Sequence, residues 1–206
     1  MSKQVVRAVV AASALLLGMS AQAALVTYRL SGWVTQSGTF DDGSTVPQFT
    51  PLTLSFSYET KQTATSLERH EDGSGRAAYE FGQPYHFTLR VGDHRARTEG
   101  YRVTLNNDLN QPFGDTFDLE ALGGVTIDGV AQPQAQLTLS LLSQGGHTDA
   151  LRSLSLPKHL NEWAFDAFRA GRLGIGSDRT LLMFDILRIK STVCAEAIPG
   201  TDDCAQ

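Results

Sequence analysis

Apolar and polar residues alternate along most of this chain. Three segments show this most clearly, with the apolar members Leu52, Leu54, Phe56 and Tyr58, then Tyr85, Phe87, Leu89 and Val91, then Leu137, Leu139 and Leu141. A period of two places these side chains on one face of an extended strand and the polar ones on the other. Strands with one apolar and one polar face are typical of antiparallel sheets, whereas parallel strands between helices are apolar on both faces. The alternation therefore predicts an all-β protein.

Turn-forming residues separate these strands. Gly92-Asp93 and Asp128-Gly129 are two of the tight-turn pairs that lie between apolar runs. Many short strands with one apolar face bury that face by packing two sheets together. We therefore expect an antiparallel two-sheet β-sandwich that is jelly-roll-like, with a closed barrel as the second choice.

One segment near the C-terminus has a different period. Its apolar residues are Leu160, Trp163, Ala164, Ala167 and Phe168. Spacings of three and four residues are those of an apolar face on a helix. Pro157 before the segment and Gly171 after it are common helix boundaries. We predict one short helix near 158–168 that covers one end of the sheets, and a further strand at 170–176.

The N-terminus predicts export. Lys3 and Arg7 precede an apolar run, and Ala21-Gln22-Ala23 supplies the small residues of a signal-peptidase site. We expect a signal peptide at 1–23, a single β-sandwich domain at 24–192 and a C-terminal tail at 193–206. The mature protein is expected in the periplasm or outside the cell.

The tail contains both cysteines, Cys194 and Cys204. Export favours a disulfide between two cysteines this close in sequence, with two reduced thiols as the alternative.

The net charge argues against a nucleic-acid partner, and the apolar pattern argues against a membrane span. Two of the 17 basic residues lie in 1–23, which leaves 15 basic and 22 acidic residues and a net charge of −7. An acidic protein gains little from neutralising phosphates, so we expect no nucleic-acid partner. No apolar stretch after residue 23 approaches the roughly 20 residues that span a bilayer, so the mature protein is expected to be soluble.

Few residues in the chain point to chemistry. The sequence contains no zinc-site spacing, no G-x-S-x-G motif and no P-loop. Asp118 and Glu120 share the polar face of a strand, where two carboxylates could act on a glycosidic bond. A solvated strand face also carries such residues, and we favour that interpretation, so no catalytic residues are expected.

Calcium is the only cofactor that the sequence leaves open. Asp41 and Asp42 precede a glycine-serine turn, and Asp108 ends the oxygen-rich run 106–108. Calcium binds six to eight oxygen ligands, although neither loop has EF-hand spacing. The polar run 70–72 is better explained as solvated loop charge.

Trp33 is the one candidate ligand-binding residue. Strict alternation places it with Arg29 and Thr35 on the polar face, where it could stack on a sugar or a protein. We favour a structural interpretation, in which a bulge at Gly32 turns the indole inward or the 158–168 segment covers it.

The order of segments resembles a known family. A signal peptide leads directly into Leu25–Thr35, and Leu52–Glu59 and Leu156-Pro157 follow. This order resembles exported β-sandwich proteins of the PEP-CTERM type, which the exosortase system sorts in Gram-negative bacteria. The resemblance implies a place in the extracellular matrix or at the cell surface, and supplies no functional residues. The chain departs from the family in its tail, which has Ile198-Pro199-Gly200 and an acidic end in place of the sorting anchor.

Together these features predict an exported, non-catalytic protein with a binding or structural role. Its expected partner is an extracellular ligand such as a polysaccharide or a matrix protein. The alternative is a carbohydrate-active protein, either a lectin-like module or a glycoside hydrolase, that uses Trp33 and an acidic cluster.

Overall fold

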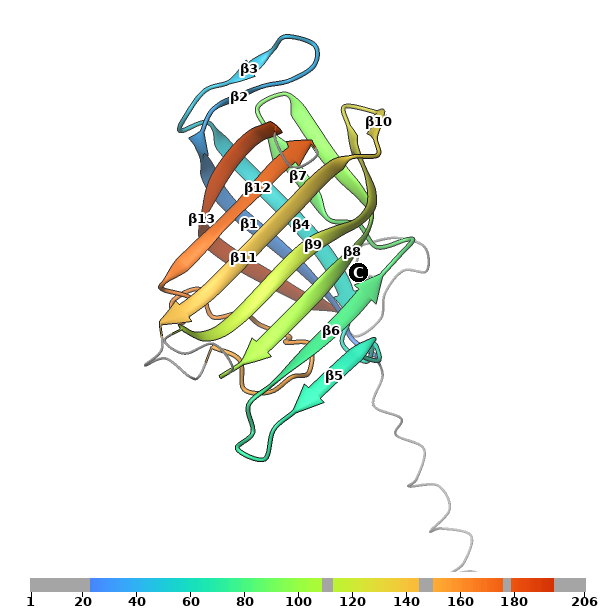
Figure 1. The fold of residues 1–206 in the computed structure, drawn as a ribbon, viewed down its shortest axis with the longest axis vertical. Helices are drawn as coiled ribbons and strands as arrows, with labels where there is room; N and C mark the ends of the chain where they lie inside the picture. Colours follow the sequence, from blue (N-terminus) through green and yellow to red (C-terminus); the bar gives the residue numbers. More distant parts are fainter. Residues whose placement is uncertain (1–22, 109–112, 145–149, 176–178, 195–206) are drawn as a thin grey trace, which may run out of the picture.

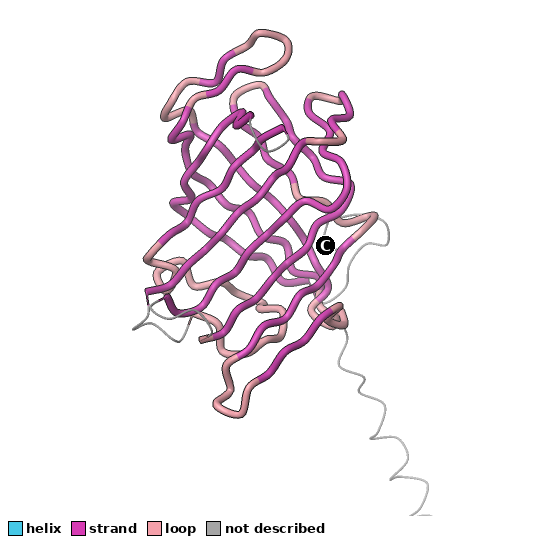
Figure 2. Tube along the Cα trace, viewed as in Figure 1, coloured by secondary structure: helices cyan, strands magenta, loops and turns pink. Residues whose placement is uncertain are grey.

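A computed structural model describes residues 23–108, 113–144, 150–175 and 179–194. These residues form thirteen strands and no helix (Figures 1 and 2). The strands are β1 (Leu25–Gln36), β2 (Gly38–Thr39), β3 (Thr45–Val46), β4 (Pro51–Glu59), β5 (Ser66–Arg69), β6 (Gly75–Phe81), β7 (Thr88–Val91), β8 (His94–Asn107), β9 (Phe113–Ile127), β10 (Val130–Gln132), β11 (Ala135–Gln144), β12 (Phe168–Ile175) and β13 (Arg179–Cys194). No helix that could cross a membrane occurs in this described part of the chain.

Eight of the strands close into an antiparallel barrel. Their order around it is β9, β11, β12, β13, β1, β4, β7 and β8, and β8 pairs with β9 to complete the circle. The β5–β6 hairpin continues from β8 beyond the barrel, because β6 pairs with the second half of β8. The short β10 forms a hairpin with β9.

The predicted two-sheet sandwich is therefore wrong. Alternation does not separate the two folds, since a sandwich strand and a barrel strand each have one buried and one exposed face. The pairing of β8 with β9 from Ala96 to Asn106 joins what would have been two free sheet edges. Glycines allow the necessary bends, because the β8 register shifts between Thr98 and Gly100 and Gly123 in β9 has a φ of 74°.

The barrel interior is the hydrophobic core. The alternating apolar residues of each strand point inward, as the prediction required, and aromatic rings fill the centre. The fully buried rings are Tyr28, Tyr58, Tyr101, Phe56, Phe87, Phe117, Phe165 and Phe184. Burial of apolar area at about 25 cal/mol per Å² is the main stabilising contribution of such a core.

Residues 150–167 form a loop that closes one end of the barrel, and we call them the plug. The predicted helix near 158–168 is absent, and the predicted strand at 170–176 is present as β12. The apolar side chains of the plug are buried, namely Leu151, Leu154, Leu156, Leu160, Ala164 and Phe165. Trp163, from the predicted apolar stripe, is 73% exposed.

Hydrogen bonds hold the first half of the plug against neighbouring strands. The hydroxyl groups of Tyr28 and Tyr58 donate to the carbonyl oxygen of Pro157 at 2.8 and 2.7 Å, and Tyr79 donates to that of Leu154 at 2.6 Å. Pro157 directly precedes the predicted helix and Leu154 lies further upstream, so these bonds fix the chain where it enters that segment. Within the predicted helix itself, Leu160, Ala164 and Phe165 pack into the hydrophobic core from a non-helical segment.

Candidate functional site

A pocket on the outer wall of the barrel combines apolar and polar groups. Strand pairing places Asp185, Ala170, Ser140 and Asp118 opposite one another on β13, β12, β11 and β9. The neighbouring row consists of Met183, Arg172, Thr138 and Glu120 on the same four strands. The residues of these two rows other than Asp185, with Phe168 at the start of β12, line a hollow of about 330 Å³ that we call the wall pocket.

The floor and sides of the wall pocket are mainly apolar. Ala170 and Gly171 form a floor of small residues, and Phe168 and Met183, at 48% and 39% exposure, stand beside it. Concave and mostly apolar sites with a few polar groups are typical of small-molecule binding sites. A larger hollow of about 450 Å³ is bounded by residues 150–161 of the plug alone.

Asp118 is the principal polar group of the wall pocket. Its Oδ1 accepts a hydrogen bond from the Ser140 hydroxyl, and its Oδ2 accepts one from Thr116 at 3.1 Å. Burial raises the pKa of the Asp118 carboxyl above its usual value, against the opposing effect of these two hydroxyl groups. A carboxyl with a raised pKa in a pocket marks a candidate functional residue.

The second predicted carboxylate lies nearby but is engaged elsewhere. Glu120 lines the wall pocket and its Oε2 lies 3.6 Å from Nη1 of Arg102. Arg102 also donates to Glu80, from Nη2 at 2.6 Å and from Nε at 3.1 Å. Asp118 and Glu120 are thus on one face as predicted, with Glu120 drawn toward a guanidinium group.

Trp33 lies on the outer wall in line with this pocket. It is opposite Asp185 in the β1–β13 pairing and is 38% exposed. The favoured interpretation, in which a bulge turns the indole inward or the 158–168 segment covers it, is wrong, because the side chain is exposed on the outer wall. A register shift does occur between Ser31 and Gly32, where a side chain on Gly32 would overlap the Asp185 carbonyl, yet Trp33 stays outside.

The calcium candidates do not meet. Asp41 and Asp42 lie in the β2–β3 hairpin, and Asp108 follows β8 at the opposite end of the barrel (Figure 1). Asp41 forms an ion pair with Arg179 at 2.5 Å and accepts a hydrogen bond from Gln132 at 3.2 Å. Within the described ranges, no group of three or more His, Cys, Asp or Glu side chains is placed to hold a metal ion.

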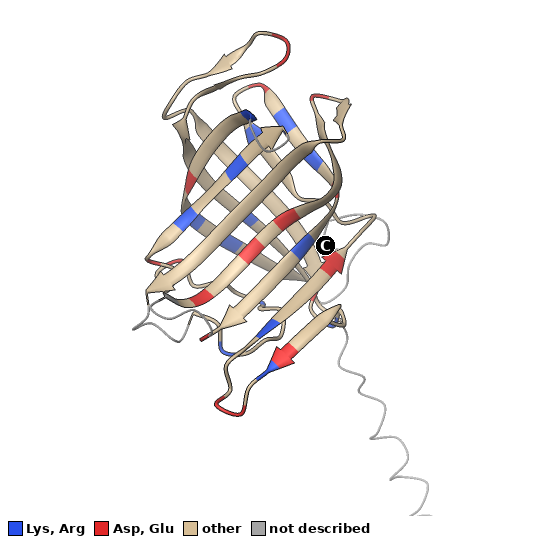
Figure 3. Ribbon diagram, viewed as in Figure 1, with Lys and Arg blue, Asp and Glu red and all other residues tan. Residues whose placement is uncertain are grey.

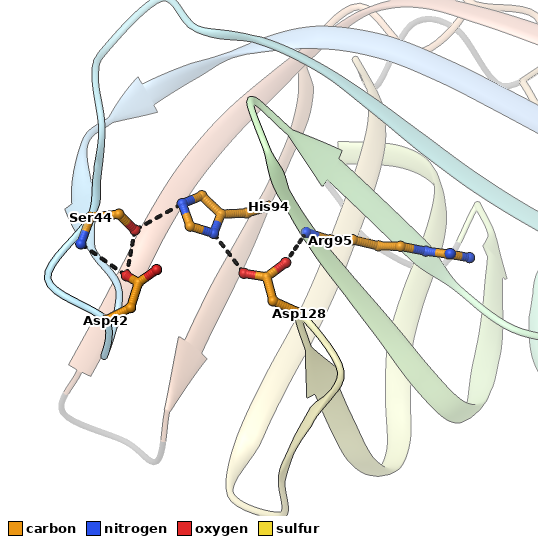
Figure 4. Close-up of polar contacts among 5 residues, drawn as sticks. All are labelled: Asp42, Ser44, His94, Arg95 and Asp128. Carbon is orange, nitrogen blue, oxygen red and sulfur yellow. Dashed lines mark hydrogen bonds and ion pairs between the residues drawn. The ribbon is translucent and has the colours of Figure 1, made fainter.

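A Ser–His–Asp cluster, absent from the sequence predictions, lies beside the β2–β3 hairpin (Figure 4). The Ser44 Oγ is 2.9 Å from Nε2 of His94, and Nδ1 of His94 is 2.6 Å from Oδ2 of Asp128. The His94 ring stacks on Phe40 with centroids 4.0 Å apart. This connectivity is that of a nucleophile, a base and an orienting carboxylate.

The remaining hydrogen bonds argue against acyl transfer at Ser44. Its hydroxyl donates to Oδ1 of Asp42 at 2.5 Å, so that proton is not directed toward His94. Two backbone N–H groups of the same turn are also used, since Ser44 N donates to the same oxygen at 2.9 Å and Gly43 N donates to the Phe40 carbonyl at 3.0 Å. An oxyanion requires donors that are still available.

A second copy of this turn supports a structural role. Residues 70–74 repeat the pattern of 40–44, with Ser74 N and Oγ donating to Asp72 at 2.9 and 2.7 Å. The hydrogen bonds from the Ser44 and Ser74 groups lower the pKa values of Asp42 and Asp72 respectively. The aspartate–serine bond therefore belongs to the turn, and His94 is what ties one of the two copies to the barrel.

Cys194 ends β13 and is buried. Cys204 and residues 1–22 lie outside the described residues, so the disulfide and the signal peptide stay predictions. No family model, curated protein or solved structure matches the chain, so the comparisons assign it to no family.

Proposed function

We propose that this protein is an exported binding protein that holds a saccharide in the wall pocket without cleaving it. The observation that carries the proposal is the combination of a small-residue floor, an exposed aromatic ring and a carboxyl group in one hollow. A sugar ring offers an apolar C–H face together with several hydroxyl donors. Phe168 and Ala170 match the first property. Asp118 matches the second, because each of its oxygens accepts one hydroxyl group of the protein and has a second lone pair for a sugar hydroxyl.

Trp33 extends this surface toward a longer ligand. It lies two strands from Ala170, because β13 with Asp185 stands between them. Neighbouring strands are about 4.8 Å apart, so the two residues are roughly 10 Å apart across the wall. An oligosaccharide could contact Phe168 in the pocket with one ring and Trp33 with another.

We propose that the saccharide is not cleaved because Asp118 and Glu120 already interact with other groups of the protein. Glycoside hydrolysis requires a general acid and a second free carboxylate on the two sides of the bond. Both oxygens of Asp118 accept hydroxyl hydrogen bonds, and Glu120 lies close to Arg102.

The binding test uses neutral oligosaccharides, namely cellohexaose, xylohexaose and maltohexaose, titrated by calorimetry. In Ala170→Leu the larger side chain projects from the floor into the wall pocket. This variant should therefore not bind any hexasaccharide that the native protein binds. The matched control is Thr192→Leu, at an exposed position of β13 away from the pocket, and should leave binding unchanged. Equal binding by the native protein and Ala170→Leu would show that the wall pocket is not the saccharide site.

The same samples test for cleavage. Each bound hexasaccharide should be recovered intact after prolonged incubation. Shorter products that disappear in Asp118→Asn would instead support the glycoside hydrolase alternative.

A further inference from the structure

The wall opposite the wall pocket carries an unusual arrangement of charge. Two adjacent rows of outward-facing residues cross β13, β1, β4, β7 and β8. The first row is Lys190, Arg29, Ser55, Thr88 and Arg97, and the second is Arg188, Ser31, Thr53, Arg90 and Arg95. We call these ten residues the basic face.

The basic face concentrates positive charge on an acidic protein. It holds six of the 15 basic residues that follow position 23, and no acidic residue. All six basic side chains are exposed. Acidic positions lie elsewhere on the barrel, for example along β9 (Figure 3).

Like charges stand directly opposite each other in the basic face. Arg29 faces Lys190 across β1 and β13, and Arg90 faces Arg95 across β7 and β8. Such cross-strand pairs destabilise a sheet. Of the six basic residues, only Arg188 forms an ion pair within the described ranges, to Glu162 at 3.1 Å. An arrangement that costs stability, and that the protein neutralises at only one of six positions, is typical of a site for an anionic ligand.

A hollow marks the centre of the basic face. Arg29, Thr53, Ser55 and Arg90 surround about 390 Å³ on the surface of β1, β4 and β7. Guanidinium groups bind carboxylate and sulfate-like oxygens through paired N–H donors, and the two hydroxyl groups between them can bond to a sugar. We propose that the basic face binds an acidic polysaccharide, at a site independent of the wall pocket.

The shape of the face favours this polymer over other polyanions. The face covers five of the eight barrel strands and is therefore convex. Double-stranded nucleic acid is stiff over about 150 base pairs and does not follow a surface this small and curved without a bending cost. Sites for single-stranded nucleic acid stack bases on aromatic rings, and none of the ten residues is aromatic.

The test measures binding of the native protein to immobilised polygalacturonate and dextran sulfate at increasing NaCl concentrations. We expect binding that weakens with salt, and the two polymers distinguish carboxylate from sulfate recognition. The double variant Arg29→Gln/Arg90→Gln should weaken binding about tenfold, as expected for the loss of two guanidinium contacts. Arg69→Gln, an exposed arginine on β5, is the matched control and should bind within about twofold of the native protein.

The controls separate this site from the wall pocket. Ala170→Leu should bind the acidic polymers normally, even where it no longer binds a neutral hexasaccharide. Unchanged binding by the double variant would overturn the proposal. Tighter binding to single-stranded DNA or to vesicles of anionic lipid than to both polysaccharides would also overturn it.

Discussion

The plug should be held on the barrel by two tyrosine hydroxyl groups that share one acceptor. Tyr28 and Tyr58 both donate to the carbonyl oxygen of Pro157, and their own hydroxyl oxygens are 3.3 Å apart. Replacing either tyrosine by phenylalanine removes one donor and leaves the ring in the core. Replacing both leaves the carbonyl group without either donor.

The magnitudes follow from this shared acceptor. Each single variant, Tyr28→Phe or Tyr58→Phe, should lower the free energy of unfolding by about 0.5–1.5 kcal/mol, the net value of one hydrogen bond. The double variant should cost roughly 1 kcal/mol more than the sum, because a half-buried carbonyl then lacks a partner. For a protein of this size each kcal/mol corresponds to about 2–4 °C in Tm.

Urea unfolding followed by circular dichroism measures the free energy of unfolding of each variant, and so the difference between the double variant and the sum of the two single variants. Tyr79→Phe is the matched control, since Tyr79 is a buried tyrosine that donates to a different carbonyl group, that of Leu154. By itself it should cost about 0.5–1.5 kcal/mol, the net value of one hydrogen bond, and it leaves the Pro157 carbonyl group with both of its donors. If the losses of unfolding free energy in Tyr28→Phe and Tyr58→Phe simply add in the double variant, the two hydroxyl groups do not share the Pro157 carbonyl, and this description of how the plug is held is wrong.

Three further predictions concern single residues. Gly171→Ala should destabilise the protein by about 1–3 kcal/mol in urea unfolding, because the new methyl group would overlap the Phe184 ring, and an unchanged midpoint would contradict this packing. Burial raises the pKa of Asp118, so the protonated carboxyl group stabilises the folded state. The free energy of unfolding should therefore fall as the pH rises through that raised pKa, and this fall should be missing in Asp118→Asn. His94→Gln should speed amide hydrogen exchange in the hairpin 40–44 roughly fivefold, equivalent to about 1 kcal/mol, while its twin turn at 70–74 exchanges as before.

The strands could be predicted from the sequence because alternation is a local signal. Leu52 to Tyr58 and Leu137 to Leu141 face the core as expected. Closure into a barrel depends on the pairing of β8 with β9, and no residue type along either strand specifies that partner. The segment 158–168 was wrongly predicted to be a helix because its apolar residues have helical spacing. In the structure these residues pack against one end of the barrel without forming a helix.

The candidate site was only partly predictable for the same reason. Trp33, Asp118 and Glu120 stood out in the sequence, and strand order places Trp33 and Asp118 in one line. Phe168 and Met183 come from strands whose neighbours the sequence does not specify. The repeated turns at 40–44 and 70–74 could have been found by comparing the two Asp-Gly-Ser segments, but the approach of His94 to one of them could not.

A single methyl signal tests the central claim, saccharide binding in the wall pocket, most directly. After residue 23 the chain contains one methionine, Met183, which lies beside the pocket floor. Exported protein labelled with carbon-13 at the methionine methyl group should therefore give one reporter signal in the pocket. Titration with a bound neutral hexasaccharide should shift that signal to saturation, with the same dissociation constant as calorimetry, and Ala170→Leu should remove the shift. A hexasaccharide that binds by calorimetry and leaves the Met183 signal unmoved would contradict the account.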